Sequence, residues 1–485
     1  MNPKAHDWDL DSFLFLGDQL WQGNLLFVNE FETKLPLLQQ VFAVPAFFGG
    51  IGAWRVMTFL LVVTCQVLSG VFLVAALNMQ TKVLWVPISG MGALLTYSLP
   101  EANSSHIGMV ASSFQLLAMT TSFLLAKKSN PLWHVLTGAT WAIASNLRPN
   151  LIIVFFIVTL ASALLTERTT VGHHLKGTLA SVGGFGFLTL ATFSPYTTSP
   201  QSLVRLVEGL QAIAGFSDGS SPTLLLIRFF INRYTIVFFA SLVLGICFFL
   251  MRRATFVQRN RSSEIALVTL AGVVGLFVSF ISSHYMPHHS VMFAPFAITF
   301  SALLIHGLTD RRGGAEHSRR YVSLLVLIGL VTTGLIALWI LFQEWEGANW
   351  RINERQIDPS VSAFLERTKE NDQSFYVVDG SQYHFLFSEE RQGDGHPAMM
   401  AAFLNGRDIP ILSDSINGDD ESSTRCQALW ARSPDVIVIE NPETELGRIA
   451  ADCLREQSDS YLPKSFNGAS RALVFELSPI NRIDP

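Results

Sequence analysis

The sequence predicts an all-α membrane domain that crosses the bilayer many times, followed by a small α/β domain. About ten apolar segments of membrane-spanning length fill residues 52–343, and a polar tail follows over 344–485. The composition agrees, because 49% of the 485 residues are hydrophobic, only 15% are charged and 37 are Phe. A soluble domain carries more charge than this on its surface. The net charge of −5 argues against nucleic acid as a partner.

Each apolar segment approaches the ~20 residues needed to cross ~30 Å of hydrocarbon. Two of the segments are short and are expected either to tilt little or to run partly along the interface. The expected spans are 52–77, 80–100, 105–126, 132–147, 151–166, 176–195, 231–251, 264–283, 289–308 and 321–343.

Lys and Arg are distributed unevenly among the connectors, which predicts an orientation. Most of them lie in connectors on one side, and the positive-inside rule assigns that side to the cytoplasm. These residues are Lys82, Lys127, Lys128, Arg168, Lys176, Arg252, Arg253, Arg259, Arg261, Arg311, Arg312, Arg319 and Arg320. With an even number of spans, the N-terminal segment and the tail are then both expected outside. An outside N-terminus with no preceding span also suggests that a first helix is missing, either from the sequence as given or from this protein compared with related ones.

Residues 1–51 form an outside segment with helical features of its own. Apolar residues from Phe13 to Trp21 repeat at helical spacing. The stretch 35–48 is apolar but too short and too interrupted by Pro to span, which favours an interfacial helix. The second long outside loop, 196–230, is expected to hold a short amphipathic helix around 203–213.

The tail has the pattern of a small α/β domain. Strands are expected at 375–379, 435–439 and 472–477, and helices at 361–369, 424–431 and 445–455. This alternation favours a partly parallel sheet. Cys426 and Cys453 share the tail and could pair in an oxidising compartment, whereas Cys65 and Cys247 are expected to be core residues of the spans.

Polar residues gather at four places that the predicted topology brings to the same membrane face. Ionisable groups at a bilayer boundary are costly unless paired or hydrated, so their clustering indicates a functional cavity. Carboxylates there could act as a general base or hold a divalent metal, and cations could bind a phosphate. The residues are Asp7, Asp9 and Asp11; Glu30, Glu32 and Lys34; Glu101, Asn103 and His106; and Arg148, Asn150, His284, Tyr285, His288 and His289.

Each group also has an ordinary structural explanation. The acids could be solvated loop residues, and Arg148 could extend its charged end to the interface from a helix end. The histidines could be interface residues without a ligand. The functional interpretation depends on one topology bringing all four groups to one surface.

The order of these motifs resembles that of the bacterial GT-C fold glycosyltransferases, which use polyprenyl-phosphate sugars. This family is related to protein O-mannosyltransferases and the lipid A aminoarabinose transferase. One branch has an Asp-Trp-Asp-Glu-like motif, a Gly-x-x-Leu-x-x-Gly helix, an acidic turn, Lys-Pro-Pro-Leu, Arg-x-Asn-Leu and a late His-Tyr pair. The matching text here is Asp7-Trp8-Asp9-Leu10, Gly17 to Gly23, Glu30-Phe31-Glu32, Lys34-Leu35-Pro36-Leu37, Arg148-Pro149-Asn150-Leu151 and His284-Tyr285.

The resemblance implies a role for each matching residue. Asp9 takes the position of the acid that activates the acceptor or binds metal. Lys34, Arg148, His284 and Tyr285 take positions that hold the carrier phosphate. Two positions depart from the pattern: Leu10 stands where a second acid is usual, and His106 where a Ser-Glu pair is usual.

The sequence therefore predicts a GT-C glycosyltransferase of the bacterial inner membrane with its tail outside the cytoplasm. It would move a sugar from a polyprenyl-phosphate donor to a glycan, lipid or protein acceptor, by direct displacement with inversion. We expect Asp9, helped by Asp11 or His106, to act as base, and a divalent metal at Asp9 and His106 is an option. Glu30, Glu32, Asn150 and His288 complete the expected substrate site. Two alternatives stay open, a transporter and a non-catalytic protein that binds lipid-linked sugars.

Overall fold

The computed structural model describes residues 8–28, 34–48, 50–80, 82–97, 106–125, 130–165, 171–215, 222–231, 235–252, 261–282, 287–309, 359–371, 373, 375–378, 435–439, 442–443, 445–456, 461–464 and 472–477. The chain divides into two compact units. One consists of residues 1–5, 54–193 and 217–350, and the other of residues 6–53, 194–216 and 351–485. Each unit is described below by itself.

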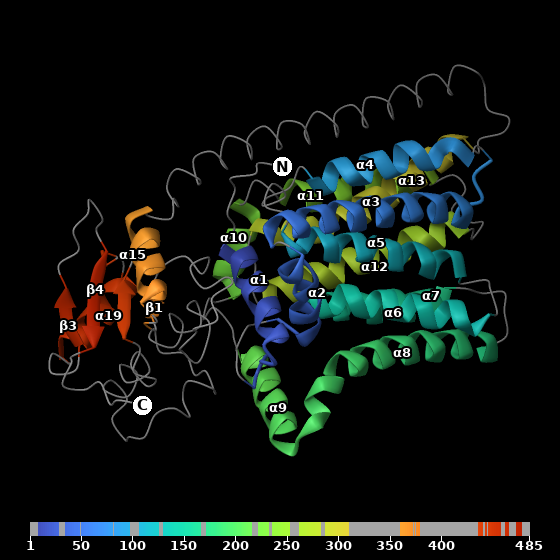
Figure 1. Ribbon diagram of the computed structural model, residues 1–485. Helices are drawn as coiled ribbons and strands as arrows, with labels where there is room; N and C mark the ends of the chain where they lie inside the picture. Colours follow the sequence, from blue (N-terminus) through green and yellow to red (C-terminus); the bar gives the residue numbers. More distant parts are fainter. Residues whose placement is uncertain are drawn as a thin grey trace. The chain divides into compact units, whose positions relative to one another are not determined.

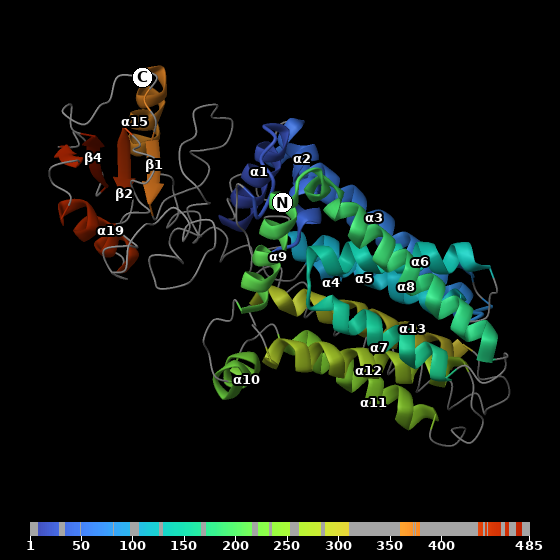
Figure 2. The same ribbon diagram turned by 90° about the horizontal axis from the view of Figure 1, so that it is seen from below.

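The first unit is a helix bundle whose helices lie side by side in both ribbon views (Figures 1 and 2). Each predicted span from 52–77 to 289–308 coincides with one of these helices or with two consecutive ones. The last predicted span, 321–343, lies outside the described residues. The helices are α3 (Ile51–Ala76), η1 (Lys82–Leu84), α4 (Trp85–Tyr97), α5 (Ile107–Leu125), α6 (Pro131–Leu147), α7 (Leu151–Leu165), α8 (Val171–Phe193), α10 (Pro222–Ile231), α11 (Ile236–Arg252), α12 (Arg261–Ser282), η6 (Pro287–Phe293) and α13 (Ala294–Thr309).

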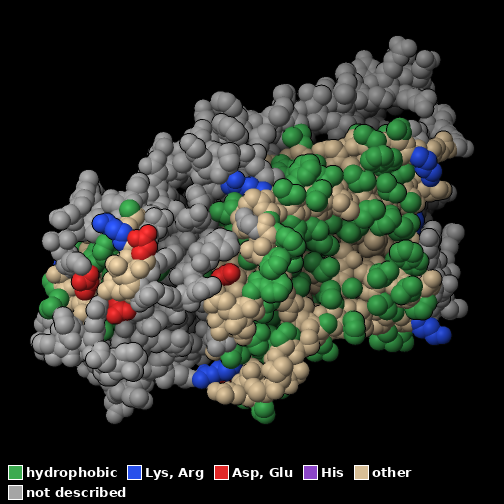
Figure 3. All heavy atoms as spheres, viewed as in Figure 1, with side chains coloured by type: hydrophobic (Ala, Val, Ile, Leu, Met, Phe, Trp, Pro, Cys, Tyr) green, Lys and Arg blue, Asp and Glu red, His purple; other side chains and the backbone are tan. Residues whose placement is uncertain are grey.

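Five helical segments among the described residues are long and apolar enough to cross a membrane. They begin at Ile51, Ile107, Leu175, Arg261 and His289. Hydrophobic side chains cover most of the described bundle surface in Figure 3, and Lys and Arg lie toward its ends. The protein is therefore an integral membrane protein, as expected from its composition.

Arg261 joins three helices at one end of the bundle. It stands at the first position of α12, and its guanidinium donates to the carbonyl oxygens of Ala76 and Phe123. These carbonyls belong to the last turns of α3 and α5, where backbone acceptors have no partner within their own helix. A cation there also complements the negative end of each helix dipole.

The first part of the second unit is a pair of packed helices, α1 (Trp8–Trp21) and α2 (Pro36–Phe47). Pro36 begins α2, where the missing N–H of proline leaves no hydrogen bond unmade. The buried Gln39 side chain donates to the carbonyls of Leu16 and Asn24 and accepts from the N–H of Leu26. These helices bear out the helical spacing before Trp21 and the short helix expected at 35–48.

A further helix, α9 (Pro200–Gly215), belongs to the same unit and follows η3 (Ser194–Thr198). It covers the amphipathic stretch expected around 203–213. A Cβ atom at Gly209 would collide with the Phe27 ring, so the absence of a side chain lets α9 approach the segment after α1.

The described part of the tail holds two helices and a four-stranded mixed sheet in the order β1-β2-β4-β3. β1 runs parallel to β2, and β4 pairs antiparallel with both β2 and β3. The three expected strands are present, and the expected helix at 424–431 lies outside the described residues. The elements are α15 (Pro359–Glu370), β1 (Phe375–Val378), β2 (Val436–Ile439), α19 (Glu445–Glu456), β3 (Tyr461–Lys464) and β4 (Leu473–Leu477).

Three of the four cysteines lie within the described residues. Cys453, in α19, is disulfide-bonded, whereas Cys65 and Cys247 are free thiols. Cys426 lies outside the described residues.

Candidate functional site

The described part of the helix bundle holds a buried cluster of one arginine and two histidines at one end. Arg148 Nη1 lies 3.2 Å from His289 Nε2. Arg148 Nη2 lies 3.2 Å from His106 Nδ1 and 3.0 Å from His106 Nε2. Their exposed fractions are 7% for Arg148, 3% for His106 and 7% for His289. We call these three residues the Arg148 cluster.

Three separate elements bring the cluster together. His106 immediately precedes α5, Arg148 is the C-cap of α6, and His289 lies in η6 just before α13. Because α5 and α6 are consecutive antiparallel helices, the start of one meets the end of the other. The Arg148 backbone is extended (φ −141°, ψ 97°), and its N–H closes the helix on the Ala144 carbonyl at 2.9 Å. Pro149 follows and disfavours a helical conformation at the preceding residue.

The hydrogen bonds around His106 show what the cluster can bind. The backbone N–H of Gly108 donates to His106 Nδ1 at 3.1 Å, so in the neutral ring the proton is on Nε2. That N–H then faces Arg148 Nη2, which can only donate. Oxygens of an anion would accept from both groups at once, and a guanidinium binds such oxygens through strong charge-assisted hydrogen bonds.

Phe280, in α12, packs flat against the His289 ring. Their ring centroids are 5.2 Å apart and their planes differ by 10°. Because a stacked neighbour limits rotation of the imidazole, Phe280 is a positioning residue for the contact between His289 and Arg148.

If the Arg148 cluster binds the phosphate of a lipid-linked sugar donor, as the resemblance of the motifs implies, replacing Phe280 by Leu is expected to weaken that binding without destroying the site. A stacked aromatic pair contributes about 0.5–1.5 kcal/mol, which corresponds to a roughly 2- to 10-fold rise in the KM for donor. We expect kcat to change less, and Phe280→Tyr, which keeps the ring, to behave like the wild type. Steady-state transfer kinetics would check this, and an unchanged KM in Phe280→Leu would contradict the positioning role.

The other predicted site residues are placed as follows. Lys34, before α2 in the second unit, lies with Nζ 6.0 Å from the centre of the Phe13 ring, a cation–π distance. Asn150 lies half-buried in the turn between α6 and α7. Asp9 and Asp11 lie in α1 and His288 in η6, but their side chains are not among those the structure describes. The predicted residues Glu30, Glu32, Glu101, Asn103, His284 and Tyr285 lie outside the described residues.

His289 is a cluster member that the motif comparison did not select. It adjoins His288, which was predicted as a substrate-binding residue. The pair of adjacent histidines marks the region in the sequence, but η6 is a short 3-10 turn whose side-chain directions depend on its exact start. The structure shows that the His289 ring faces Arg148.

A divalent metal at Asp9 and His106 stays a prediction. The described residues contain no group of three His, Cys, Asp or Glu side chains that could hold a metal ion. As arranged, His106 does not fit a metal ligand, because the guanidinium of Arg148 lies beside both of its ring nitrogens. A divalent cation at either nitrogen would face that positive charge at close range.

No family model matches the sequence, and no curated protein matches it. The fold, however, is similar to that of solved membrane proteins. ArnT from Cupriavidus metallidurans, bound to undecaprenyl phosphate, matches with a TM-score of 0.56 and 13% identity over 96% of this chain and 93% of that chain. The Archaeoglobus fulgidus oligosaccharyltransferase tethered with an acceptor peptide matches with a TM-score of 0.52 and 12% identity, over 98% and 70%.

Both similar proteins are GT-C fold glycosyltransferases. The chain thus has the fold of this class of membrane protein, in agreement with the resemblance of its motifs. At these identities the likeness establishes the fold, and the activity has to be argued from the site.

Proposed function

We propose that the protein is a membrane glycosyltransferase that transfers a sugar from a polyprenyl-phosphate donor to an acceptor outside the cytoplasm. The observation that carries the proposal is the Arg148 cluster, a buried set of N–H donors suited to an anion, at one end of a GT-C helix bundle. The oxygens of a phosphate can accept two parallel hydrogen bonds from one guanidinium, which is bidentate binding. The similar ArnT structure contains a polyprenyl phosphate.

The proposed reaction is a single displacement at the anomeric carbon. The acceptor hydroxyl oxygen forms a bond to that carbon while the bond from the carbon to the phosphate oxygen breaks, which inverts the configuration. Asp9 takes the hydroxyl proton as general base. Arg148 donates to the polyprenyl phosphate as its negative charge develops, and Lys34, His284 and Tyr285 are proposed to assist.

Two observations support an orientation with the tail outside the cytoplasm. The positive-inside count places the connectors rich in Lys and Arg in the cytoplasm. Cys453 in the tail is disulfide-bonded, and disulfides persist in oxidising compartments. A bacterial inner membrane with the tail in the periplasm or outside the cell satisfies both.

The second unit carries an apolar surface suited to the membrane boundary. Trp21, Phe47 and Phe48 are exposed, and their rings contact one another at centroid distances of 5.1 and 5.0 Å. The Trp21 indole also donates to the Ala43 carbonyl at 2.7 Å. Such amphipathic aromatics favour the headgroup region, and this patch ends only three residues before α3 begins. We propose that it rests in the outer leaflet where the lipid donor enters.

Replacing Asp9 by Asn tests the reaction. We expect transfer from a polyprenyl-phosphate sugar to fall by roughly 10²–10⁴-fold, the usual contribution of a general base, while binding of polyprenyl phosphate is kept. Asp18→Asn is the matched control, because it removes the same charge from the same helix, at a residue that accepts an exposed hydrogen bond from Gln22. Transfer should be measured in membranes with radiolabelled donor.

Three outcomes separate the proposal from its alternatives. Loss of transfer in Asp9→Asn alone supports the enzyme. Phosphate binding without transfer in the wild type supports a non-catalytic protein that binds lipid-linked sugars. Movement of an intact donor across vesicle membranes, without transfer, supports a transporter.

A further inference from the structure

A line of polar side chains runs through the interior of the helix bundle between α3, α4 and α5. Its centre is Gln66, which is 2% exposed. The Gln66 amide nitrogen donates to Thr96 Oγ1 at 3.2 Å and to Ser113 Oγ at 3.4 Å. Ser89 Oγ donates to the backbone carbonyl of Gln66 at 3.0 Å. One glutamine therefore joins all three helices.

Several polar atoms on the buried side of α3 and at the end of α4 are buried without a hydrogen-bond partner among the residues that the structure describes. They are Gln66 Oε1, Thr58 Oγ1, Ser69 Oγ and Tyr97 Oη. Thr58, Gln66 and Ser69 all lie on the buried side of α3, and Tyr97 ends α4. We call these residues, with Ser89, Thr96 and Ser113, the polar seam.

Leaving these atoms unpaired would be costly. An amide or hydroxyl moved from water into an apolar interior without a hydrogen bond costs about 1–3 kcal/mol by protein mutational data. In a membrane-spanning bundle no bulk solvent is present at the surface of the helices to satisfy such groups. Four such atoms on one interface would offset much of the stability of a typical domain, so the natural conclusion is that something binds them.

We propose that the polar seam is an internal water site. Water is the ligand class that fits, because it donates and accepts in turn and commonly makes about three hydrogen bonds to otherwise unsatisfied buried groups. The seam consists of amide and hydroxyl groups and contains no carboxylate, ammonium, guanidinium or imidazole, so it lacks the charged side chains that typically hold a transported ion. A Cβ atom at Gly92 would collide with Gln66 Oε1, and one at Gly70 with Ser89 Oγ, so both glycines leave space for the polar groups.

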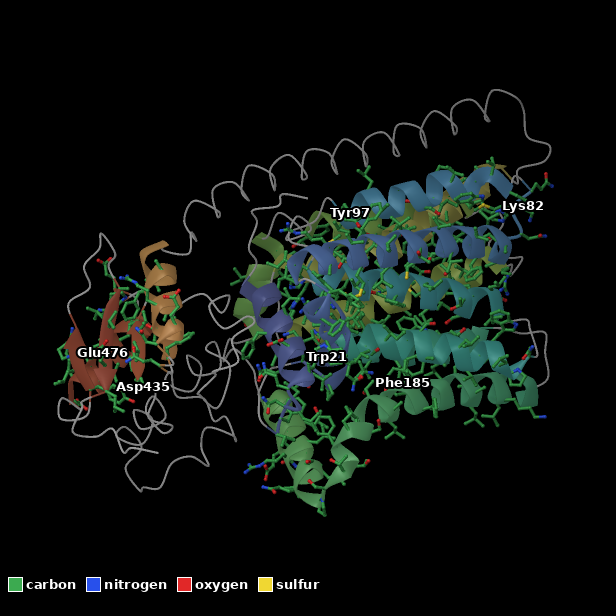
Figure 4. All side chains as sticks on the ribbon, viewed as in Figure 1. Trp21, Lys82, Tyr97, Phe185, Asp435 and Glu476 are labelled. Carbon is green, nitrogen blue, oxygen red and sulfur yellow. The ribbon has the colours of Figure 1, made fainter. Side chains whose placement is uncertain are left out.

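The seam begins at the end of the bundle that holds the Arg148 cluster. Tyr97 is at the opposite end of α4 from Lys82 (Figure 4), and α5 starts beside His106. Ser113 lies about two turns along α5 from His106, so the seam fixes α5 against α3 and α4 below the candidate site. Water in the seam would then hold in place the helix that carries His106. This inference stands on the described bundle and does not require the proposed transferase activity.

Hydroxyl-radical labelling by X-ray radiolysis tests the proposal, since radicals formed from bound water oxidise the side chains beside it. Met109 packs with Val62 and Tyr97, and both Met109 and Tyr97 serve as reporters. Trp141, in α6, is the dry reference, because it is fully buried and its indole N–H donates to Ser122 Oγ. The full-length protein in nanodiscs should be exposed for milliseconds and the labels located by mass spectrometry.

We expect Met109 and Tyr97 to be oxidised several-fold faster than Trp141. Gln66→Leu, which removes the central carboxamide at similar volume, should reduce labelling of both reporters several-fold and leave Trp141 unchanged. Thr58→Val, a smaller change at one end of the seam, serves if Gln66→Leu does not fold. Labelling of Met109 and Tyr97 no faster than that of Trp141, or labelling unchanged in both variants, would overturn the water site.

Discussion

Transfer from a polyprenyl-phosphate sugar is expected to fall about 10²–10³-fold when Arg148 is replaced by Ala, the effect of removing one pre-positioned donor to a developing anion. The reason is geometric as well as electrostatic. Arg148 reaches His106 and His289 with two different nitrogens of one planar group, so its loss removes the centre of the cluster. Binding of polyprenyl phosphate itself, measured by photo-crosslinking, should weaken in parallel.

Arg148→Lys separates charge from shape. A lysine keeps the positive charge but cannot reach both imidazoles with a planar fork, so we expect it to recover only a small part of the activity. Arg455→Ala is the control, because it removes an arginine whose contact is an exposed ion pair with Asp452 in α19. Wild-type transfer in Arg148→Ala would exclude the cluster as the phosphate site, and equal losses in Arg455→Ala would indicate a general effect on the protein.

The membrane-spanning helices can be predicted well from the sequence because each consists of a long, almost continuous run of apolar residues. A run of about twenty apolar residues rarely forms anything except a membrane-spanning helix, so α3, α5 and α12 could be located directly. Short helices and strands are harder to predict from the sequence. The helix α10 was not expected, because nearly all of its residues fall in the stretch 196–230, which was predicted as an outside loop with one short helix around 203–213. The edge strand β3 was missed because Pro463 argues against a strand, although an edge strand tolerates proline where its N–H side is unpaired.

The candidate site was predictable only in part, because the sequence indicates which helix ends lie together but not how their side chains are directed. The topology indicates that the residues at the end of α6 and the start of α5 share one end of the bundle, which is why Arg148 and His106 could be proposed together. Topology cannot give distances of 3.0–3.2 Å, nor the direction of the His289 ring toward Arg148. Those details depend on side-chain direction in a 3-10 turn and on the Gly108 N–H that orients His106.

A second large effect is expected at the contact between α6 and α8, where glycine lets two membrane helices approach. A Cβ atom at Gly138 would collide with the backbone carbonyl of Ser181, and one at Gly184 with that of Val135. Backbone atoms in packed helices cannot move aside as a flexible side chain would. Gly138→Ala is therefore expected to force the helices apart and to lower the free energy of unfolding by about 1–3 kcal/mol.

The matched control for this contact lies one position before Gly184. A Cβ atom added at Gly183 would have nothing within 4 Å, so Gly183→Ala places the same methyl group in open space. There the higher helix propensity of Ala should act alone and favour the helix by about 0.8–1.0 kcal/mol. Thermal unfolding in detergent should thus show opposite shifts for the two variants. If Gly138→Ala were as stable as Gly183→Ala, the close approach of α6 and α8 would be wrong, and with it the placement of the α6 end that carries Arg148.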